Sequence, residues 1–168
     1  MTTEITFEAH HTQQLVLEDP HRFITMVCGR RWGKDHLASI KILSHSLTHT
    51  SSRGGKMYAW LNPVYNPQGK ESFRVFRSFA ESGGLIKKVV ETPPMEVRLI
   101  NGDKVTFFSA DQPDNLRGGQ YDGVILNEAG FISDLDEGWS GPVAAMLLDR
   151  PGWASSMGTP KGTNPVHQ

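Results

Sequence analysis

The stretch FITMVCGRRWGKD, which runs from Phe23 to Asp35, decides the fold of this chain. Residues 23–27 have the composition of a buried strand, a short turn with Gly29 and Gly33 follows, and residues 36–48 repeat apolar side chains at helical spacing. Such a turn can bind a phosphate, because backbone N–H groups converge on the anion, the helix dipole attracts it and Lys34 neutralises it. The stretch therefore predicts a phosphate site.

The match to the phosphate-loop pattern G-x-x-x-x-G-K-[ST] is incomplete at two positions. Cys28 stands where the pattern has its first glycine, and Asp35 stands where it has Ser or Thr. Taken alone, the stretch also fits a plain strand, turn and helix with Lys34 on the surface.

Composition limits the class of protein. The chain has 168 residues, one cysteine and a formal net charge of -1, and 38% of its residues are hydrophobic. This length predicts one domain with a substantial core, and a single cysteine excludes an internal disulfide and fits a reducing compartment. We expect no membrane span and no signal peptide, because no apolar run is long enough and the N-terminus is polar.

The balanced charge argues against a protein that binds nucleic acid over its whole surface. A polyanion would have to bind a local group of basic residues, and the group in the turn is Arg30, Arg31 and Lys34. The other groups are interpreted as solvated surface: Lys70, Arg74 and Arg77, and Lys87 with Lys88.

Strand and helix patterns alternate along the rest of the chain. The expected elements are a strand over residues 56–61, a helix over 67–82, a hairpin of residues 96–100 and 104–109 around Asn101-Gly102, a strand over 122–128, a helix over 138–149 and a strand over 153–157. The predicted fold class is α/β, a mostly parallel sheet with helices on both faces and an antiparallel hairpin at one edge.

The predicted strand over residues 122–128 ends on polar residues. In an open parallel sheet ligands bind beyond the carboxyl ends of the strands, so Asn127 and Glu128 are expected to project towards the phosphate site. A site for a metal ion and an attacking water needs such residues at this edge.

The motifs together resemble the ATPase domain of the terminase large subunit of tailed bacteriophages, the motor that packages DNA into a procapsid. The resemblance covers nearly the whole chain and rests on residues 11–14, 29–34, 63–68, 116–118, 124–129 and 158–162. It implies a P-loop NTPase fold in which residues 29–34 correspond to the Walker A motif and residues 124–128 to the Walker B motif.

The resemblance also implies roles for individual residues. Lys34 and the backbone amides around it would hold the phosphates of ATP, Glu128 would activate the attacking water, and Thr159 would sense the γ-phosphate at the coupling motif. Arg30 or Arg31 would act as the arginine of the phosphate loop. The full nucleotide-binding set is Gln14, Gly29, Arg30, Arg31, Trp32, Gly33, Lys34, Asp35 and His36, where Gln14, or else Gln13, would contact adenine. Arg117 is a weaker candidate for contacting a neighbouring subunit's nucleotide.

Two departures from the family pattern concern Mg²⁺. The family has a Ser or Thr hydroxyl after the lysine and an Asp before the catalytic glutamate, and here these positions hold Asp35 and Asn127. Our hypothesis is that the charge that binds the metal has moved from the strand end to the helix start, so that Asp35 and Asn127 form the metal site and activity survives at a full or a reduced rate. The alternative is a module that binds nucleotide but hydrolyses it poorly or not at all.

The implied function is ATP hydrolysis that powers the translocation of double-stranded DNA. The implied partners are DNA, the portal, the small terminase subunit and further copies of the chain in a ring, and no membrane is expected. The implied location is the host cytoplasm, at the procapsid portal. We expect residues 1–168 to be one ATPase domain, as a fragment or otherwise, without the family's nuclease domain. A helicase-type P-loop motor is a rival interpretation, and a simple DNA-binding domain has little support.

Overall fold

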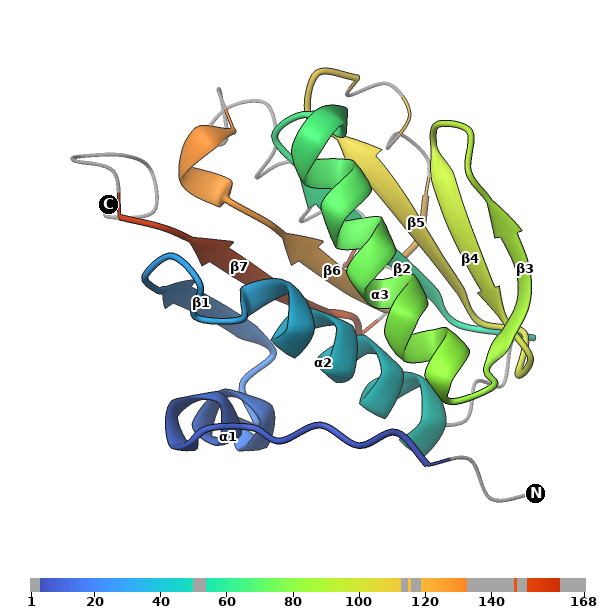
Figure 1. Ribbon diagram of the computed structural model, residues 1–168, viewed down its shortest axis with the longest axis horizontal. Helices are drawn as coiled ribbons and strands as arrows, with labels where there is room; N and C mark the ends of the chain where they lie inside the picture. Colours follow the sequence, from blue (N-terminus) through green and yellow to red (C-terminus); the bar gives the residue numbers. More distant parts are fainter. Residues whose placement is uncertain are drawn as a thin grey trace.

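One mixed sheet of seven strands organises the chain in the computed structural model, which describes residues 4–49, 54–112, 115, 119–132, 147 and 151–160. The order of the strands across the sheet is β1-β7-β6-β2-β5-β4-β3 (Figure 1). Their bounds are β1 Phe23–Val27, β2 Met57–Asn62, β3 Ile86–Val90, β4 Met95–Leu99, β5 Lys104–Ser109, β6 Gly123–Leu126 and β7 Trp153–Gly158.

The sheet is parallel from β1 to β5 and antiparallel at its other end. The β1–β7, β7–β6, β6–β2 and β2–β5 pairs are parallel, whereas β4 runs antiparallel to both β5 and β3. This confirms the mostly parallel sheet and the hairpin around Asn101-Gly102. The edge strand β3 is an addition that the sequence pattern did not predict, and its exposed Lys87 and Lys88 discourage pairing with another chain.

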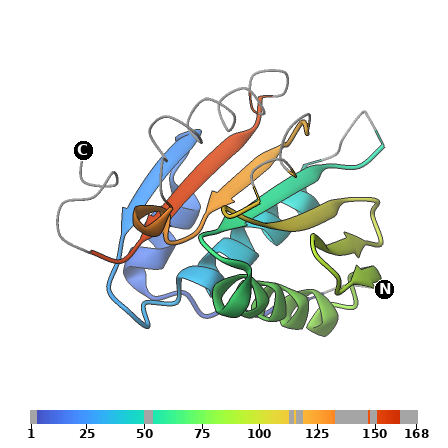
Figure 2. The ribbon, with the colours of Figure 1, turned by 90° about the horizontal axis from the view of Figure 1, so that it is seen from above.

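The helical residue Leu147 packs in the core on one face of the sheet, whereas three helices lie on the other face (Figure 2). They are α1 (His11–Glu18), α2 (Lys34–Thr48) and α3 (Lys70–Ser82), with a π turn η1 (Tyr65–Gly69) before α3 and a 3-10 turn η3 (Ala129–Phe131) after β6. The helix expected over residues 138–149 lies outside the described residues except for Leu147. None of the helices in the described part is long and apolar enough to cross a membrane.

Alternation along β2 divides the core between the two faces of the sheet. Tyr58 and Trp60 belong to the large cluster under α2 and α3, whereas Ala59 and Leu61 belong to a smaller cluster on the opposite face. The Phe73 ring of α3 packs edge-on against Phe107 of β5, with ring centroids 5.4 Å apart. Phe73 and Phe76 of α3 are therefore core residues, as the helical spacing predicted, and the partly buried Phe79 packs against the same cluster.

A buried polar network closes the end of the sheet where α2 stops. Ser46 donates a hydrogen bond to Asp103 over 2.6 Å, and the Lys56 ammonium lies 4.0 Å from the same carboxylate. Lys56 also donates to the carbonyls of His45 and Ser46 at 2.8 and 3.1 Å, where a cation offsets the helix dipole. The network anchors this end and lies away from the carboxyl ends of the parallel strands.

Register brings the carboxyl ends of the parallel strands level with one another. Val27 pairs with Gly158, and Leu126 pairs with both Ser156 and Leu61. The residues that follow β1, β6 and β7 therefore emerge together at one edge of the sheet.

Candidate active site

The loop between β1 and α2 has the backbone of an anion-binding turn. Gly33 is the N-cap of α2 with φ 88°, a left-handed conformation that favours glycine. Because glycine has no side chain to cap the helix, the first N–H groups of α2 are left to bind an anion. Arg31, in the same loop, is also left-handed, with φ 61°.

Gln13 clamps this loop from α1. Its side chain is 5% exposed, its amide nitrogen donates to the carbonyl of Trp32 over 3.0 Å, and its oxygen accepts from the backbone N–H of His10 over 3.2 Å. The His10 ring also packs edge-on against Trp32, with centroids 4.9 Å apart. Trp32 is thus held by two residues at the start of α1.

Gln14, the first choice for an adenine contact, does not reach the loop. It is exposed and donates to the carbonyl of Ala9 over 3.1 Å. Successive residues on a helix point about 100° apart, so only one of the two glutamines can face the loop, and the capping geometry of His10 selects Gln13. Of the two candidates, Gln13 is therefore the one beside the phosphate loop.

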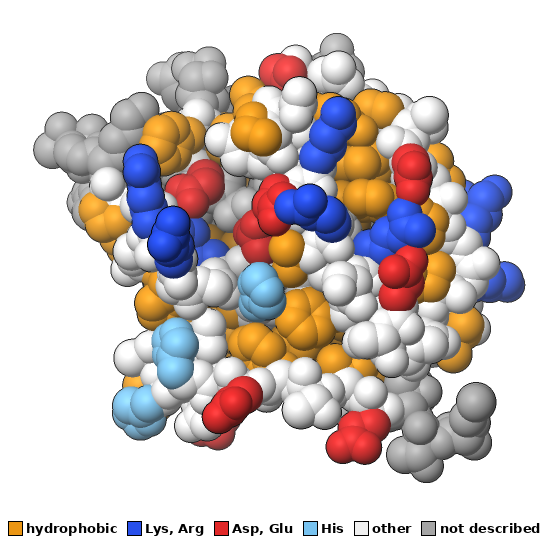
Figure 3. All heavy atoms as spheres, in the orientation of Figure 1, with side chains coloured by type: hydrophobic (Ala, Val, Ile, Leu, Met, Phe, Trp, Pro, Cys, Tyr) orange, Lys and Arg blue, Asp and Glu red, His pale blue; other side chains and the backbone are white. Residues whose placement is uncertain are grey.

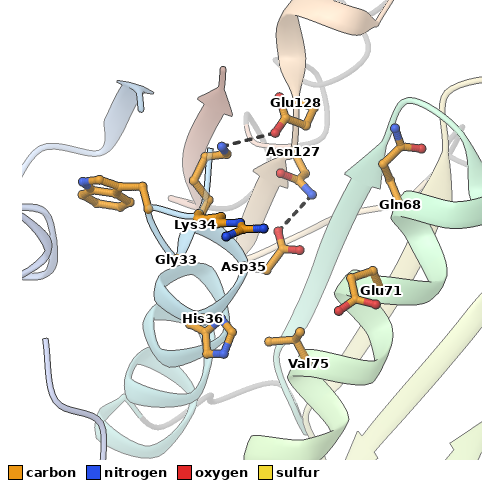
Figure 4. A pocket seen from close by; sticks show the side chains of 11 residues that line it. Gly33, Lys34, Asp35, His36, Gln68, Glu71, Val75, Asn127 and Glu128 are labelled. Carbon is orange, nitrogen blue, oxygen red and sulfur yellow. Dashed lines mark hydrogen bonds and ion pairs between the residues drawn. The ribbon is translucent and has the colours of Figure 1, made fainter. Parts of the chain in front are cut away.

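Lys34 and Glu128 face each other beyond the ends of the strands (Figure 4), and Thr159 contacts both. The Lys34 ammonium donates to the Thr159 hydroxyl over 2.9 Å and lies 3.3 Å from the Glu128 carboxylate. Thr159 in turn donates to Glu128 from its backbone N–H and from its hydroxyl, each over 3.1 Å. Residues that follow β6 and β7 thus converge on the lysine of the loop, which is 9% exposed.

Backbone strain is confined to the same place. Among the described residues other than glycine, Arg31 and Glu128 alone have positive φ, with Glu128 at 48°. This conformation costs a residue with a side chain about 1–2 kcal/mol. Two strained residues that line one cavity point to a functional constraint.

Asp35 and Asn127, the two departures from the family pattern, contact each other. The Asn127 amide nitrogen donates to one oxygen of the Asp35 carboxylate over 3.0 Å (Figure 4). Ser72 of α3 lies 3.4 Å from the other oxygen. Burial raises the pKa of Asp35; Lys34 and Ser72 oppose this effect, and Glu128 and Glu71 add to it.

Two adjacent cavities open over these side chains. One, of about 340 Å³, is lined by residues that include Lys34, Asp35, Glu71, Asn127 and Glu128. The other, of about 540 Å³, adds the exposed Arg30 together with Thr159 and Pro160, and Arg31 lines both. His36, which lines the first cavity, is exposed and packs edge-on against Phe79, with centroids 5.5 Å apart.

The oxygen atoms near Asp35 suit a hard cation. Mg²⁺ is held by one or two protein oxygens together with phosphate and water, so a cage of protein ligands is unnecessary. The described residues contain no group of three or more His, Cys, Asp and Glu that could form such a cage. The Asn127 side-chain oxygen is buried and has no hydrogen-bond partner in this part of the chain, so Asp35 and Asn127 fit the cation that accompanies ATP.

Some site residues were missed by sequence reasoning, and others lie outside the described part. Asn62 and Ser72, which contact Asn127, were not singled out, although Asn62 ends a buried strand and could have been found by that position. Gln68 lines both cavities and was quoted only as part of a motif. Arg117 lies outside the described residues.

The fold and the loop place the chain in the class of P-loop nucleotide-binding folds. A parallel sheet delivers a loop, with lysine at the start of the next helix, beside polar residues at the ends of neighbouring strands.

Comparison with known proteins finds similar chains among the large terminases of phages. The chain is 27% identical to the terminase large subunit of Thermus phage G20c over 180 residues, which cover 94% of this chain and 35% of that protein. The ATPase domain of the Thermus phage P74-26 large terminase superposes with a TM-score of 0.72 at 27% identity, over 96% of this chain and 68% of that one. The large terminase of another thermophilic bacteriophage, solved in complex with ADP, shares the fold, with a TM-score of 0.63 at 14% identity over 89% of this chain and 38% of that one. No family model matches the chain.

The resemblance to the ATPase domain of phage terminase large subunits is therefore confirmed in sequence and in fold. The chain spans about a third of the length of the curated relatives it matches.

Proposed function

We propose that this chain binds and hydrolyses ATP as the motor domain of a phage DNA-packaging machine. The observation that carries the proposal is the convergence of Lys34, at the start of α2, with Glu128 and Thr159, at the ends of β6 and β7; their side-chain polar atoms lie within 3.3 Å of one another. The likeness to terminase ATPase domains supports the same function.

The phosphates of ATP would bind at the start of α2. The N–H groups that follow Gly33 and the Lys34 ammonium supply the positive field there, and Arg30 and Arg31 line the rim of the adjoining cavity. Gln13 holds the Trp32 carbonyl and so fixes the shape of the loop on the side where the adenine would lie.

Glu128 would orient and deprotonate the attacking water. Its carboxylate is held by Lys34 and Thr159, and it must be released from the lysine before it can act on a water molecule. A triphosphate attracts the Lys34 ammonium more strongly than one carboxylate does, so binding of ATP would release Glu128 on the Lys34 side. Thr159 would then report the state of the γ-phosphate to β7.

Asp35 and Asn127 would hold Mg²⁺, which neutralises charge on the phosphates when it is bound. A carboxylate at the helix start and an amide at the strand end carry the same total charge as the family's hydroxyl and carboxylate. Their contact over 3.0 Å supports the idea that the two departures compensate each other.

The wider role follows from the relatives. As part of a terminase large subunit, the chain would act with double-stranded DNA, the portal, the small terminase subunit and other copies in a ring, in the host cytoplasm. On the face shown in Figure 3, basic and acidic side chains are interspersed, so DNA would be contacted locally.

A module that binds nucleotide without hydrolysing it is the second candidate. It is favoured by Asp35, which places a carboxylate where the phosphates would bind, and by Asn127, which lacks the usual charge. A negative charge near a phosphate weakens binding unless a cation compensates for it.

Nucleotide binding and phosphate release separate the two candidates. We expect the wild-type chain, Lys34→Ala and Glu128→Gln to differ: the wild type binds and hydrolyses, Lys34→Ala does neither well, and Glu128→Gln binds without hydrolysing. An ATPase function predicts a loss of at least about 100-fold in turnover for Glu128→Gln. Binding without phosphate release by the wild type, even with Mn²⁺, would favour the silent module.

A further inference from the structure

Asn62, Ser72 and Asn127 form a buried cluster of uncharged polar side chains beside Asp35. They come from the end of β2, the first turn of α3 and the end of β6, and they are 0%, 0% and 4% exposed. Ser72 donates to the Asn62 oxygen over 2.9 Å, and the Asn127 nitrogen lies 3.0 Å from the same oxygen and 3.1 Å from the Ser72 hydroxyl. Three elements are thus joined by side chains next to the cavity.

The cluster allows one orientation of the Asn127 amide. A carboxylate only accepts hydrogen bonds, so the Asn127 atom that faces Asp35 must be the nitrogen. The Asn62 atom that faces this nitrogen must then be an oxygen, and the Ser72 hydroxyl proton is directed to that oxygen. Each of the three side chains therefore orients the next, and the chain of contacts ends at the Asp35 carboxylate.

This orientation leaves two buried atoms without a partner. The Asn62 nitrogen and the Asn127 oxygen have no hydrogen bond within the described ranges. Buried polar atoms of this kind cost stability, and apolar side chains of the same shape would avoid the cost. A cluster that served only the packing of β2, β6 and α3 would not need these groups.

We propose that Asn62 and Ser72 are positioning residues for the cation that accompanies ATP. They hold the Asn127 nitrogen against Asp35, which fixes the carboxylate that carries the charge of the metal site. This inference rests on the proposed function, because it requires that Mg²⁺ enter with the nucleotide. It assigns to β2 and α3 a part in cation binding although neither supplies a charged ligand.

The test measures how much Mg²⁺ tightens the binding of a fluorescent, non-hydrolysable ATP analogue. For each variant of the full chain, the Kd is measured with Mg²⁺ and again with EDTA. Ser72→Ala and Asn62→Leu should reduce the tightening by Mg²⁺ about five- to tenfold and change the Kd in EDTA less than about twofold, because the phosphate loop is untouched.

Ser46→Ala is the matched control. Ser46 is also a buried serine whose hydroxyl donates to a side-chain oxygen, here that of Asp103, but it lies at the opposite end of the sheet. The Ser46→Ala substitution should lower the melting temperature as Ser72→Ala does and leave the tightening by Mg²⁺ unchanged. If Ser72→Ala fails to fold, Ser72→Cys keeps the volume with a weaker hydrogen bond and should show the same loss in part.

A double-mutant cycle separates positioning from a general structural effect. In an Asp35→Asn background, Ser72→Ala should have no further effect on the tightening by Mg²⁺, whereas its effect on the melting temperature should persist. Full tightening retained by both Ser72→Ala and Asn62→Leu overturns the inference alone. A wild-type chain that binds the analogue equally well with and without Mg²⁺ overturns the proposed metal site as well, and one that does not bind it overturns the proposed function.

Discussion

Replacing Glu128 by Gln should tighten the binding of ATP while it removes the proposed base. The Glu128 carboxylate lies 3.3 Å from the Lys34 ammonium, and the two side chains are 21% and 9% exposed. ATP must therefore compete with this carboxylate for the lysine. Glutamine has the same size and keeps one oxygen, which can accept from the Thr159 backbone N–H, but it has no negative charge with which to compete for Lys34.

The size of the effect follows from Coulomb's law. Two unit charges 3.3 Å apart attract by about 5 kcal/mol at an effective dielectric constant of about 20 and by about 1.3 kcal/mol in bulk water. When ATP binds, only the contact between Lys34 and Glu128 is lost. Glu128 keeps its two hydrogen bonds from Thr159 and Lys34 keeps its bond to the Thr159 hydroxyl, so the gain in the free energy of ATP binding on removing the Glu128 charge lies near the lower value. We expect a Kd for ATP about tenfold lower in Glu128→Gln.

A fluorescence titration with a non-hydrolysable ATP analogue in Mg²⁺ measures this change. Glu71→Gln is the control, because Glu71 lines the same cavity but is 51% exposed and pairs with Arg74. Removing that charge should change the Kd less than about twofold, since an exposed ion pair contributes little. An unchanged or higher Kd in Glu128→Gln, or an equal gain in both variants, would refute the competition for Lys34.

Two further predictions concern stability. Gly33→Ala should lower the free energy of unfolding by about 2–3 kcal/mol, because φ is 88° and the new Cβ would lie 2.8 Å from the Gln13 amide nitrogen. Gly84→Ala, with φ 64° and open space around it, should cost about 1 kcal/mol in the same urea titration, and equal losses would contradict the clash. Burial, with help from His49 and Lys56, lowers the pKa of His45 to about 4. The unfolded chain therefore takes up this proton near pH 6.5 and the native chain does not, so His45 costs stability as the pH falls from 6.5 to about 4. The difference in the free energy of unfolding between His45→Gln and the wild type should therefore shift by about 1.5 kcal/mol in favour of the variant between about pH 7 and about pH 4.5, a value discounted because the side chain is partly exposed. The same difference at both pH values would argue against the lowered pKa.

The sequence was sufficient for features that depend on neighbouring residues. The strand, turn and helix from Phe23 onward can be predicted because the turn needs glycine at a left-handed position and the flanking elements have their own periodicity. The hairpin follows in the same way from Asn101-Gly102. In contrast, β3 was missed because its exposed lysines break the strand pattern, and its place is decided by pairing with β4.

Sequence rules could bring Glu128 and Thr159 to the right edge of the sheet, but they could not say which atoms meet. That depends on the strand order, which places β7 beside β1 and β6 beside β7 and is a property of the whole fold. The contact of Asp35 with Asn127, and the choice of Gln13 over Gln14, were decided by packing between elements distant in sequence. Asn62 and Ser72 are ordinary residues in the sequence, and only the tertiary structure buries them side by side at Asp35, where an unpaired polar atom is costly and each hydrogen bond fixes the next.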